Sequence, residues 1–257
     1  MRSPVVHRNM RYNCRVLIFM GEILLIRPKM QLANDGNYRE TRWFSAWQRP
    51  GAIEDFVFPI AWGTPSSRGQ SSCPFGDAVI QAHDGCIGFE ICEELFTPES
   101  TSTSLALDGV EIISNGSGSH HELRKLHRRM ELIMGATSKL GGIYMYANQK
   151  GCDGERVYYD GSSVIVQNGS VLSQGAQFSI KNVEVVFADV SLEEVRQYRG
   201  GNRSMSVQGS APNRIRFPRV KVDLVIAQRS IEDTPLTKKR APFYHTPEME
   251  ITYEECF

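Results

Sequence analysis

The amino-acid sequence predicts an α/β fold built on a mixed or antiparallel sheet. Short apolar runs rich in β-forming residues outnumber the helical segments, and the two kinds alternate along the chain. One segment, residues 119–140, places apolar side chains at helical spacing. The chain has 257 residues, of which 41% are hydrophobic and 23% are charged. This composition is typical of a globular protein with a sizeable core.

The first predicted element is a β-hairpin. Residues 15–20 (RVLIFM) and 23–28 (ILLIRP) are apolar runs that only Gly21-Glu22 separates. A two-residue loop that begins with glycine suits a type II′ turn. Residues 29–44 are rich in turn-forming and aromatic residues, and we predict an ordered loop with a helical turn there.

A second hairpin is predicted from residues 77–82 and 86–92, around the turn at His83-Asp84-Gly85. The stretch before it, residues 61–76, is rich in Gly, Ser and Pro, and we interpret it as a surface insertion. Residues 109–117 (GVEIISNGS) form the next predicted strand, which is apolar enough to be buried.

The second half of the chain starts with a predicted helix from Ser119, a candidate N-cap, to about Leu140, where Gly141-Gly142 supplies the stop. Asn168-Gly169 is a strong hairpin signal between two apolar runs. The other predicted elements are strands at 142–148, 183–190 and 219–227 and a helix opened by the capping box Ser191–Glu194.

Charge and cysteine content limit the possible partners and compartment. Lys plus Arg and Asp plus Glu number 29 each, which gives no support for a nucleic-acid or membrane-surface role. No apolar run approaches the length that spans a bilayer, and residues 1–10 lack the apolar stretch of a secretory signal. The six cysteines include no CxxC pair. We therefore predict a cytoplasmic protein with free thiols.

Cys92 is the leading candidate for chemistry. It ends the apolar run 86–92, and the acidic segment EELFTPE follows at once. A thiol at a strand-to-helix junction faces backbone N–H groups and the positive end of a helix dipole, which favour the thiolate and can hold an oxyanion. The alternative is a small buried core residue, which is what we expect for the other five cysteines.

A nucleophilic cysteine needs a partner, and Lys29 is a candidate because it directly follows the predicted strand at 23–28. A lysine at the rim of a sheet would stabilise a thiolate and then an oxyanion, and the alternative is a solvated surface lysine. The histidine pair His120-His121 is expected in a solvent-facing first turn of a helix. Neither HExxH nor paired CxxC spacing occurs, so no metal site is predicted.

Five blocks of the sequence, in order, resemble a known family: RYNCRVLIFM, LLIRPKMQLANDGNYRE, FEICEELFTP, NGSGSHHELRK and GGIYMYANQKGCDGERVYYDGS. They are similar to the glutamine amidohydrolase domain of glutamine-dependent NAD⁺ synthetases, which belongs to the nitrilase (carbon–nitrogen hydrolase) superfamily. The resemblance spans about residues 7–226, and YHTPEMEI (244–251) resembles the linker that precedes the synthetase domain of that family. It implies a four-layer α-β-β-α sandwich.

The resemblance also implies a catalytic centre. Cys92 matches the nucleophile and Lys29 the lysine of the family's Glu-Lys-Cys triad. Cys92 would attack the side-chain amide of L-glutamine and release ammonia, and water would then hydrolyse the thioester. Lys29 and the N–H of Glu93 would stabilise the oxyanion. Glu93 is also expected to bind the substrate or orient the thiol, and Glu94 to brace Lys29; the alternative for both is a solvated position.

Glutamine recognition is implied for three further residues. Tyr38 matches a substrate-contacting tyrosine, and Ser119 and Arg124 match the groups that hold the α-amino and α-carboxylate ends. Lys125 is the alternative to Arg124, although a carboxylate favours the bidentate fork of arginine.

The chain departs from the family in two places. The family's catalytic Glu lies before the RYNC block, in a portion that also holds the first strand and helices of the sandwich, so we expect these to be missing. No SGGxDS-like phosphate loop occurs, so the domain that binds ATP and Mg is expected to be absent, and no cofactor is expected in this chain. We predict a partial carbon–nitrogen hydrolase domain over residues 1–229 and a linker or tail over residues 230–257.

Three functions fit these observations. The first is the glutaminase part of a glutamine-hydrolysing NAD⁺ synthase, impaired alone, with L-glutamine as ligand, a synthetase domain normally in cis, and further copies of the same protein as partners. The second is a catalytically dead remnant that acts as an interaction module. The third is a free-standing amidase of the same superfamily, against which the linker-like residues 244–251 argue.

Overall fold

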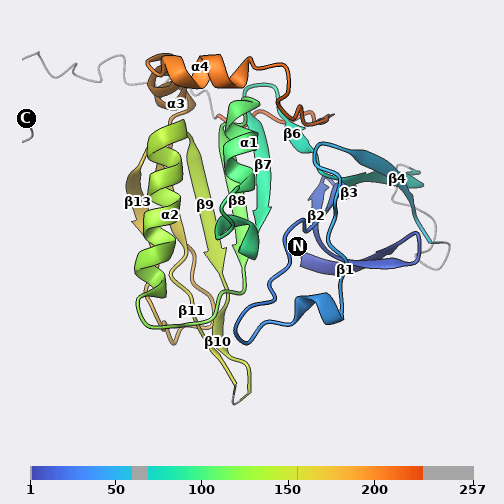
Figure 1. The fold of residues 1–257 in the computed structure, drawn as a ribbon, viewed down its shortest axis with the longest axis vertical. Helices are drawn as coiled ribbons and strands as arrows, with labels where there is room; N and C mark the ends of the chain where they lie inside the picture. Colours follow the sequence, from blue (N-terminus) through green and yellow to red (C-terminus); the bar gives the residue numbers. More distant parts are fainter. Residues whose placement is uncertain (1, 60–68, 155, 228–257) are drawn as a thin grey trace, which may run out of the picture. The chain divides into compact units, whose positions relative to one another are not determined.

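The computed structural model describes residues 2–59, 69–154 and 156–227. The chain divides into two compact units, Met1–Val225 and Ile226–Phe257, and the helices and strands belong to the first. The described strands form a five-stranded sheet, a seven-stranded sheet and a two-stranded ribbon (Figure 1).

The five-stranded sheet has the strand order β1-β2-β3-β5-β4. Its strands are β1 Arg2–His7, β2 Met10–Phe19, β3 Glu22–Pro28, β4 Ile53–Val57 and β5 Ser72–Gly76. The first three pair antiparallel in sequence order, and β3 pairs parallel with β5. The buried core of this sheet consists of Val5, Tyr12, Cys14, Ile26, Trp47, Phe56, Cys73 and Phe75.

The predicted hairpin between β2 and β3 is present, but its turn lies one residue earlier than expected. Phe19 pairs with Glu22, so Met20 and Gly21 are the loop residues. Both have positive φ, 49° and 83°. Positive φ at both central residues defines a type I′ turn, which matches the twist of the strands as well as type II′ does.

The predicted surface insertion at residues 61–76 was wrong for its last part. Residues 61–68 lie outside the described residues, but Ser72–Gly76 is strand β5. Its alternate residues Cys73 and Phe75 are buried, with exposed fractions of 3% and 0%. The alternation of buried and half-buried side chains lies within a strand of only five residues, and the Gly- and Ser-rich sequence before it makes the alternation hard to recognise.

The seven-stranded sheet has the order β13-β12-β9-β8-β7-β6-β14. Its strands are β6 Val79–Gln81, β7 Cys86–Ile91, β8 Ile112–Ser117, β9 Ile143–Asn148, β12 Val164–Gln167, β13 Ser170–Gln174 and β14 Arg219–Lys221. β7, β8 and β9 run parallel, so their carboxyl ends meet at one edge. The ribbon pairs β10 Lys150–Cys152 with β11 Tyr158–Asp160 near that edge.

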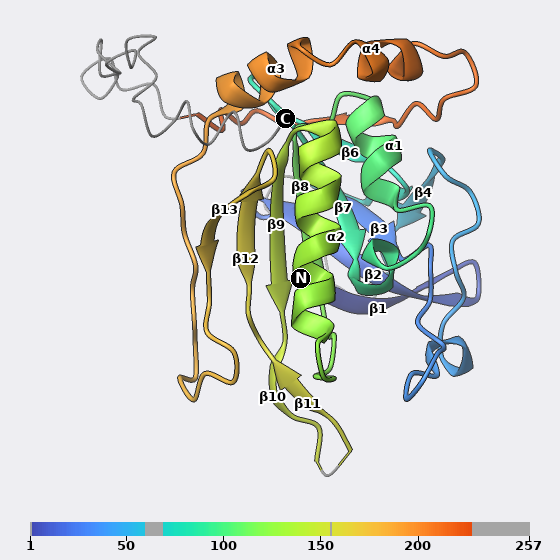
Figure 2. The same cartoon turned by 60° about the vertical axis from the view of Figure 1, so that its left-hand side comes forward.

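Parallel neighbours need crossover connections, and helices provide them. Helix α1 (Thr101–Leu107) links β7 to β8 and helix α2 (Lys125–Leu140) links β8 to β9. Both pack on one face of the seven-stranded sheet, while α3 (Leu192–Gly200) and α4 (Arg203–Gly209) lie at one end of it (Figure 2). The core between sheet and helices consists of Val79, Cys86, Leu95, Leu105, Val110, Ile113, Ile133, Tyr144, Tyr146, Val164, Val166 and Phe217.

The α/β sandwich class is thus confirmed, with one helical layer and two sheets in the part of the chain that the structure describes. The 3-10 turn η1 (Glu40–Arg42) confirms the helical turn expected in the loop after β3. The hairpins at β6–β7 and at Asn168-Gly169 are also confirmed. Ser191 accepts a hydrogen bond from the Glu194 N–H at 3.2 Å, so it caps α3 as predicted.

Two predicted strands are wrong in whole or in part. Residues 183–190 form no strand, and Val183, Val185 and Phe187 are 75%, 75% and 84% exposed. The alternating pattern is real, but no strand pairs with it among the described residues. Of the predicted strand at 219–227, only Arg219–Lys221 is a strand, and it pairs parallel with β6.

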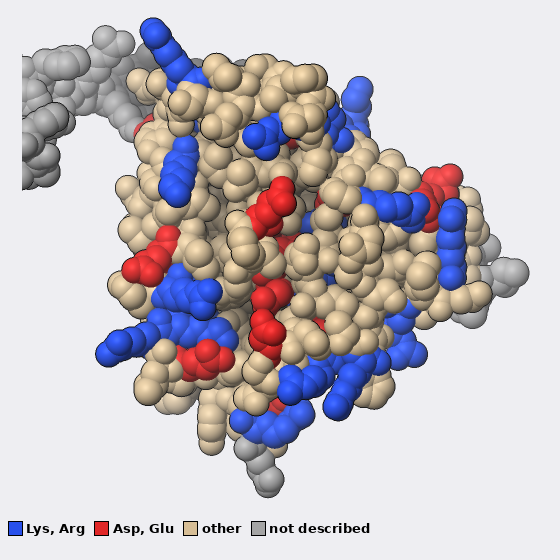
Figure 3. Space-filling model, in the orientation of Figure 1, with Lys and Arg blue, Asp and Glu red and all other residues tan. Residues whose placement is uncertain are grey.

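The surface carries both charges. On the face drawn in Figure 3, Asp and Glu side chains form a short central column with Lys and Arg side chains on both sides. No helix within the described ranges has the length and apolar content needed to cross a membrane.

A buried ion pair ties α2 to the ribbon. Arg129 donates two hydrogen bonds to Asp160, at 3.0 and 2.6 Å, and both side chains are 1% exposed. Burial acts to raise the pKa of Asp160, but hydrogen bonds from Arg129 and Gln177 outweigh it and hold that pKa below its usual value. Gln177 and Asn148 also donate to the same carboxylate, at 3.0 and 3.2 Å.

We expect this pair to give the protein an acid-sensitive part of its stability. Since the folded-state pKa of Asp160 is depressed, its contribution is present above the unfolded pKa of about 3.9 and is lost as pH falls through the folded value. Asp160→Asn should cost about 3 kcal/mol at neutral pH and flatten the loss of stability below about pH 4. Urea unfolding at a series of pH values measures both. The exposed Asp189→Asn is the control, and an equal effect in both variants contradicts the prediction.

Candidate active site

Cys92 lies where the sequence predicted it, at the carboxyl end of β7. It is the first residue of the 3-10 turn η3 (Cys92–Leu95) and is 6% exposed. Its φ is 50°, the left-handed region that a residue with a Cβ rarely adopts. Such a conformation costs about 1–2 kcal/mol and persists only where its surroundings impose it. The strain therefore marks Cys92 as a position whose backbone geometry matters.

Lys29 follows β3 and is 2% exposed, which rules out the solvated surface lysine. Its ammonium donates to Glu40 Oε2 at 2.5 Å. Glu40 also accepts from Asn13 Nδ2 at 2.6 Å and from the Ala33 N–H at 2.8 Å. The lysine is thus fixed by a carboxylate that our sequence reasoning did not select. A buried ammonium needs a counter-charge, and this requirement could have pointed to a carboxylate in the loop that follows Lys29.

Glu94 is fully buried, so the solvated alternative is wrong for this residue. Its carboxylate accepts from the Met30 N–H at 2.7 Å, from the Ile91 N–H at 2.7 Å and from Arg27 Nη1 at 2.8 Å. Glu94 therefore holds the backbone beside Lys29, whereas the Lys29 ammonium itself is held by Glu40. These bonds also bring the chain after β3 against the turn that follows β7.

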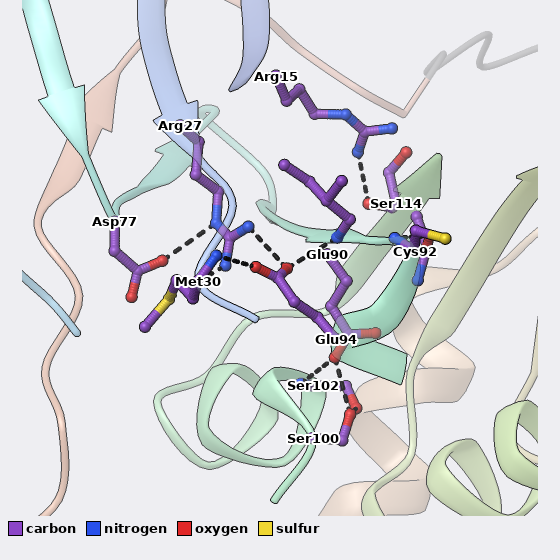
Figure 4. Close-up of polar contacts among 12 residues, drawn as sticks. Arg15, Arg27, Met30, Asp77, Glu90, Cys92, Glu94, Ser100, Ser102 and Ser114 are labelled. Carbon is purple, nitrogen blue, oxygen red and sulfur yellow. Dashed lines mark hydrogen bonds and ion pairs between the residues drawn. The ribbon is translucent and has the colours of Figure 1, made fainter. Parts of the chain in front are cut away.

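Arg27 completes this cluster. Its guanidinium lies between Glu94 and Asp77, to which Nε donates at 3.1 Å, and the three side chains are no more than 1% exposed (Figure 4). A buried charge is tolerated only when its partners surround it. Arg15, also from the five-stranded sheet, donates to the Ser114 carbonyl of β8 at 2.5 Å. Charged side chains thus join the two sheets next to Cys92.

Glu93 is half-buried. Burial raises its pKa, and the nearby Lys29 partly offsets that rise. Lys125 acts on Glu93 in the same direction. Glu93 therefore lies within electrostatic range of both lysines.

Tyr38 and His120 are in direct contact. The Tyr38 hydroxyl donates to the Gly118 carbonyl at 3.1 Å, accepts from the His120 N–H at 3.0 Å and lies 2.7 Å from His120 Nδ1. Burial raises the pKa of Tyr38, and the neighbouring Cys92 adds to the rise. His120 is 5% exposed, so its predicted solvent-facing position was wrong.

The helix predicted from Ser119 begins later, at Lys125. The intervening residues are taken up by the site: His120 forms a backbone bridge with Tyr159, and the Ser119 N–H donates to Asn148 Oδ1 at 2.9 Å. Ser119 is 1% exposed, and its buried hydroxyl makes no hydrogen bond to the described residues. An unpaired buried hydroxyl is available for a ligand.

The structure separates the two candidates for a carboxylate partner. Arg124 is exposed and lines a surface hollow with Leu123 and His127. Lys125 is half-buried, and its ammonium lies 5.7 Å from the centre of the Tyr38 ring. Of the two, Lys125 is the one that lies beside the other candidate residues.

A cavity of about 850 Å³ adjoins these groups. Lys29, Tyr38, Glu40, His120 and Tyr159 are among its lining residues. This volume is within the range of about 300–1,000 Å³ that small-molecule sites occupy. Cys92 is buried and is not among the residues that line it, but it raises the pKa of Tyr159 as well as that of Tyr38, each time as a smaller cause than burial. The thiol thus lies within electrostatic reach of the cavity wall.

No cluster of three or more His, Cys, Asp and Glu side chains suited to a metal ion occurs in the described ranges. The arrangement consists instead of a strained cysteine at a parallel strand end, a buried lysine paired with the part-buried Glu40, and a cavity lined by polar and apolar side chains. In open α/β sheets, ligands bind outside the carboxyl ends of the strands. Fold and site together define an α/β-sandwich protein with a candidate site at the carboxyl edge of its parallel strands.

Residues 3–200 match the carbon–nitrogen hydrolase family, so the chain belongs to that family. The chain is 54% identical to the glutamine-dependent NAD(+) synthetase of Saccharomyces cerevisiae and 50% identical to that of Homo sapiens, each over 251 residues. These matches cover 96% and 97% of this chain and 35% of each relative, so the chain spans about a third of their length. The crystal structure of a glutamine-dependent NAD(+) synthetase from Cytophaga hutchinsonii superposes with a TM-score of 0.61 and 30% identity, over 73% of this chain and 29% of that one.

Proposed function

We propose that this chain is the glutamine-hydrolysing part of an NAD⁺ synthase and that Cys92 is its nucleophile. The observation that carries the proposal is the strained, buried Cys92 at the end of β7, in a chain about half identical to glutamine-dependent NAD(+) synthetases. The ammonia produced would serve a synthetase domain that carries the ATP- and Mg-dependent step and is absent from these residues.

The reaction divides into two acyl transfers. The Cys92 thiolate adds to the side-chain carbonyl carbon of L-glutamine, and the oxyanion is held by the Lys29 ammonium and the Glu93 N–H. The C–N bond then breaks, and the nitrogen takes the proton that the Cys92 thiol lost and leaves as ammonia. Water attacks the thioester and releases glutamate and the free thiol. Because the Cys92 N–H already donates to Asn115 at 3.0 Å, it is not one of the proposed oxyanion donors.

Substrate orientation is assigned to Tyr38, which lines the cavity, and to three further polar residues. The carboxylate of glutamine would bind Lys125 or Arg124, and the position of Lys125 beside Tyr38 favours the former. The unpaired Ser119 hydroxyl and Tyr38 would hold the other polar groups of the ligand.

Assembly with further copies and a cytoplasmic location are parts of the same proposal. The exposed Val183, Val185 and Phe187 offer apolar surface for such contacts.

A diazoketone analogue of L-glutamine tests the proposal. Such a probe binds as glutamine, and attack by a thiolate forms a thioether with loss of N₂. We expect a single adduct on Cys92, found by peptide mass spectrometry, which L-glutamine suppresses and D-glutamine does not. The exposed Cys152 serves as an internal control for unselective alkylation.

The interaction-module alternative predicts the opposite result. A catalytically dead remnant would fold and associate, yet leave Cys92 unmodified at probe concentrations that modify Cys152. A folded chain without a glutamine-protected adduct on Cys92 would therefore overturn the proposal.

A further inference from the structure

The backbone of Cys92 is held by a side chain from the neighbouring strand. The Cys92 N–H donates to Asn115 Oδ1 at 3.0 Å, and the same oxygen accepts from Ser117 Oγ at 2.9 Å. Asn115 belongs to β8 and is fully buried. Its amide must present the oxygen to Cys92, because an NH₂ group there would face the N–H of Cys92.

Asn115 is in turn oriented by Tyr144 of β9. Asn115 Nδ2 donates to the Tyr144 hydroxyl at 3.0 Å. That hydroxyl has one proton and gives it to Glu90 Oε2, so it can only accept from Asn115. The order of donors and acceptors therefore runs in one direction and fixes which way the Asn115 amide points.

Glu90 anchors the other end. It lies two residues before Cys92 on β7 and pairs in register with Asn115 on β8. Its second oxygen accepts from Ser100 Oγ at 2.8 Å and from the Ser102 N–H at 2.5 Å, at the start of α1. Glu90 and Tyr144 are fully buried, as Asn115 is. Figure 4 shows Glu90 and the two serines on the helix side of Cys92, apart from the Arg27–Asp77 pair.

We propose that Glu90, Tyr144 and Asn115 form a positioning relay that imposes the left-handed conformation of Cys92 and so presents its thiol for reaction. The relay rests on the proposed role of Cys92 as nucleophile. None of the three side chains lines the cavity, and each acts through the next until Asn115 binds the backbone of Cys92. Without the relay, Cys92 relaxes toward an ordinary backbone conformation, which turns its thiol away from the reacting position.

The test measures the reactivity of Cys92 toward iodoacetamide, a probe that requires no glutamine site. The 257-residue chain and its variants are alkylated in their folded state, and the rate at Cys92 is followed by peptide mass spectrometry. We expect Tyr144→Phe to slow this rate about 3- to 10-fold, the value of one hydrogen bond, and Asn115→Ala to slow it about 10- to 100-fold. Tyr144→Phe keeps the ring and its packing, so it remains informative if Asn115→Ala fails to fold.

The matched control is Tyr12→Phe, which removes the hydroxyl of another buried tyrosine, one that contacts Met10 Sδ in the other sheet. It should leave Cys92 reactivity unchanged even if both Tyr→Phe variants lower Tm equally. In glutamine hydrolysis, Tyr144→Phe should lower kcat and leave KM unchanged, the pattern of a positioning defect.

A wild-type alkylation rate in Tyr144→Phe overturns the relay, as does a wild-type rate in a folded Asn115→Ala variant or an equal slowing by Tyr12→Phe. The proposed function fails in a different way. If the relay variants slow alkylation but the wild-type chain forms no glutamine-protected adduct, the relay stands and the assigned substrate is wrong.

Discussion

Replacing Cys92 with alanine should reduce ammonia release from L-glutamine to the background of the assay. Removal of the nucleophile in a covalent mechanism costs about 10⁶-fold in kcat, because the remaining groups can only assist direct attack by water. The measurement is coupled ammonia detection in the protein that carries this chain, with the diazoketone probe as an independent readout. The fold should survive, since Cys→Ala at a small buried site removes one sulfur atom.

The control is Cys86→Ala, which removes the thiol of the first residue of β7, six residues before Cys92. Burial raises the pKa of Cys86 to about 11, although Arg219 partly offsets the effect, so this thiol is protonated at neutral pH. We expect activity close to that of the wild type. Retained turnover in Cys92→Ala would exclude Cys92 as the nucleophile, whatever the effect of Cys86→Ala.

The sequence predicts the residues at the ends of strands better than it predicts the side chains that contact those residues. Cys92 and Lys29 are found from the apolar runs that precede them, because the period of a strand and the change of composition at its end are local signals. Glu40 and Asn115 are not found that way. Glu40 lies 11 residues after Lys29 and Asn115 lies 23 residues after Cys92, and only the folded contacts show which carboxylate and which amide are the partners.

The errors have the same origin. Ser119 looks like an N-cap, but it is bound by Asn148 from another strand, which delays the helix to Lys125. Residues 183–190 alternate as a strand does, but a strand also needs a partner for its backbone, and the pattern alone does not supply one. In the first case a tertiary contact overrides a local preference, and in the second the tertiary partner that the local preference needs is not found among the described residues.

Lys29→Met should lower kcat for glutamine hydrolysis about 10²- to 10³-fold with little change in KM. The ammonium is proposed to bind the oxyanion, which exists only after attack, so its loss raises the barrier without weakening substrate binding. Methionine keeps most of the length of the side chain. Lys139→Met, at an exposed position of α2, is the control and should leave kcat unchanged.

A second substitution, at the ion-pair partner Glu40, separates the catalytic role of Lys29 from its structural role. Lys29→Met leaves the Glu40 carboxylate, whose side chain is 13% exposed, without its cation, and this adds a cost that is unrelated to catalysis. Glu40→Gln in the same chain removes that unpaired charge. If Lys29 only pairs with Glu40, the double variant should recover activity and stability together. If Lys29 binds the oxyanion, stability should recover while kcat stays low. A rise in KM alone, with kcat preserved, would show that Lys29 holds the substrate and not the oxyanion.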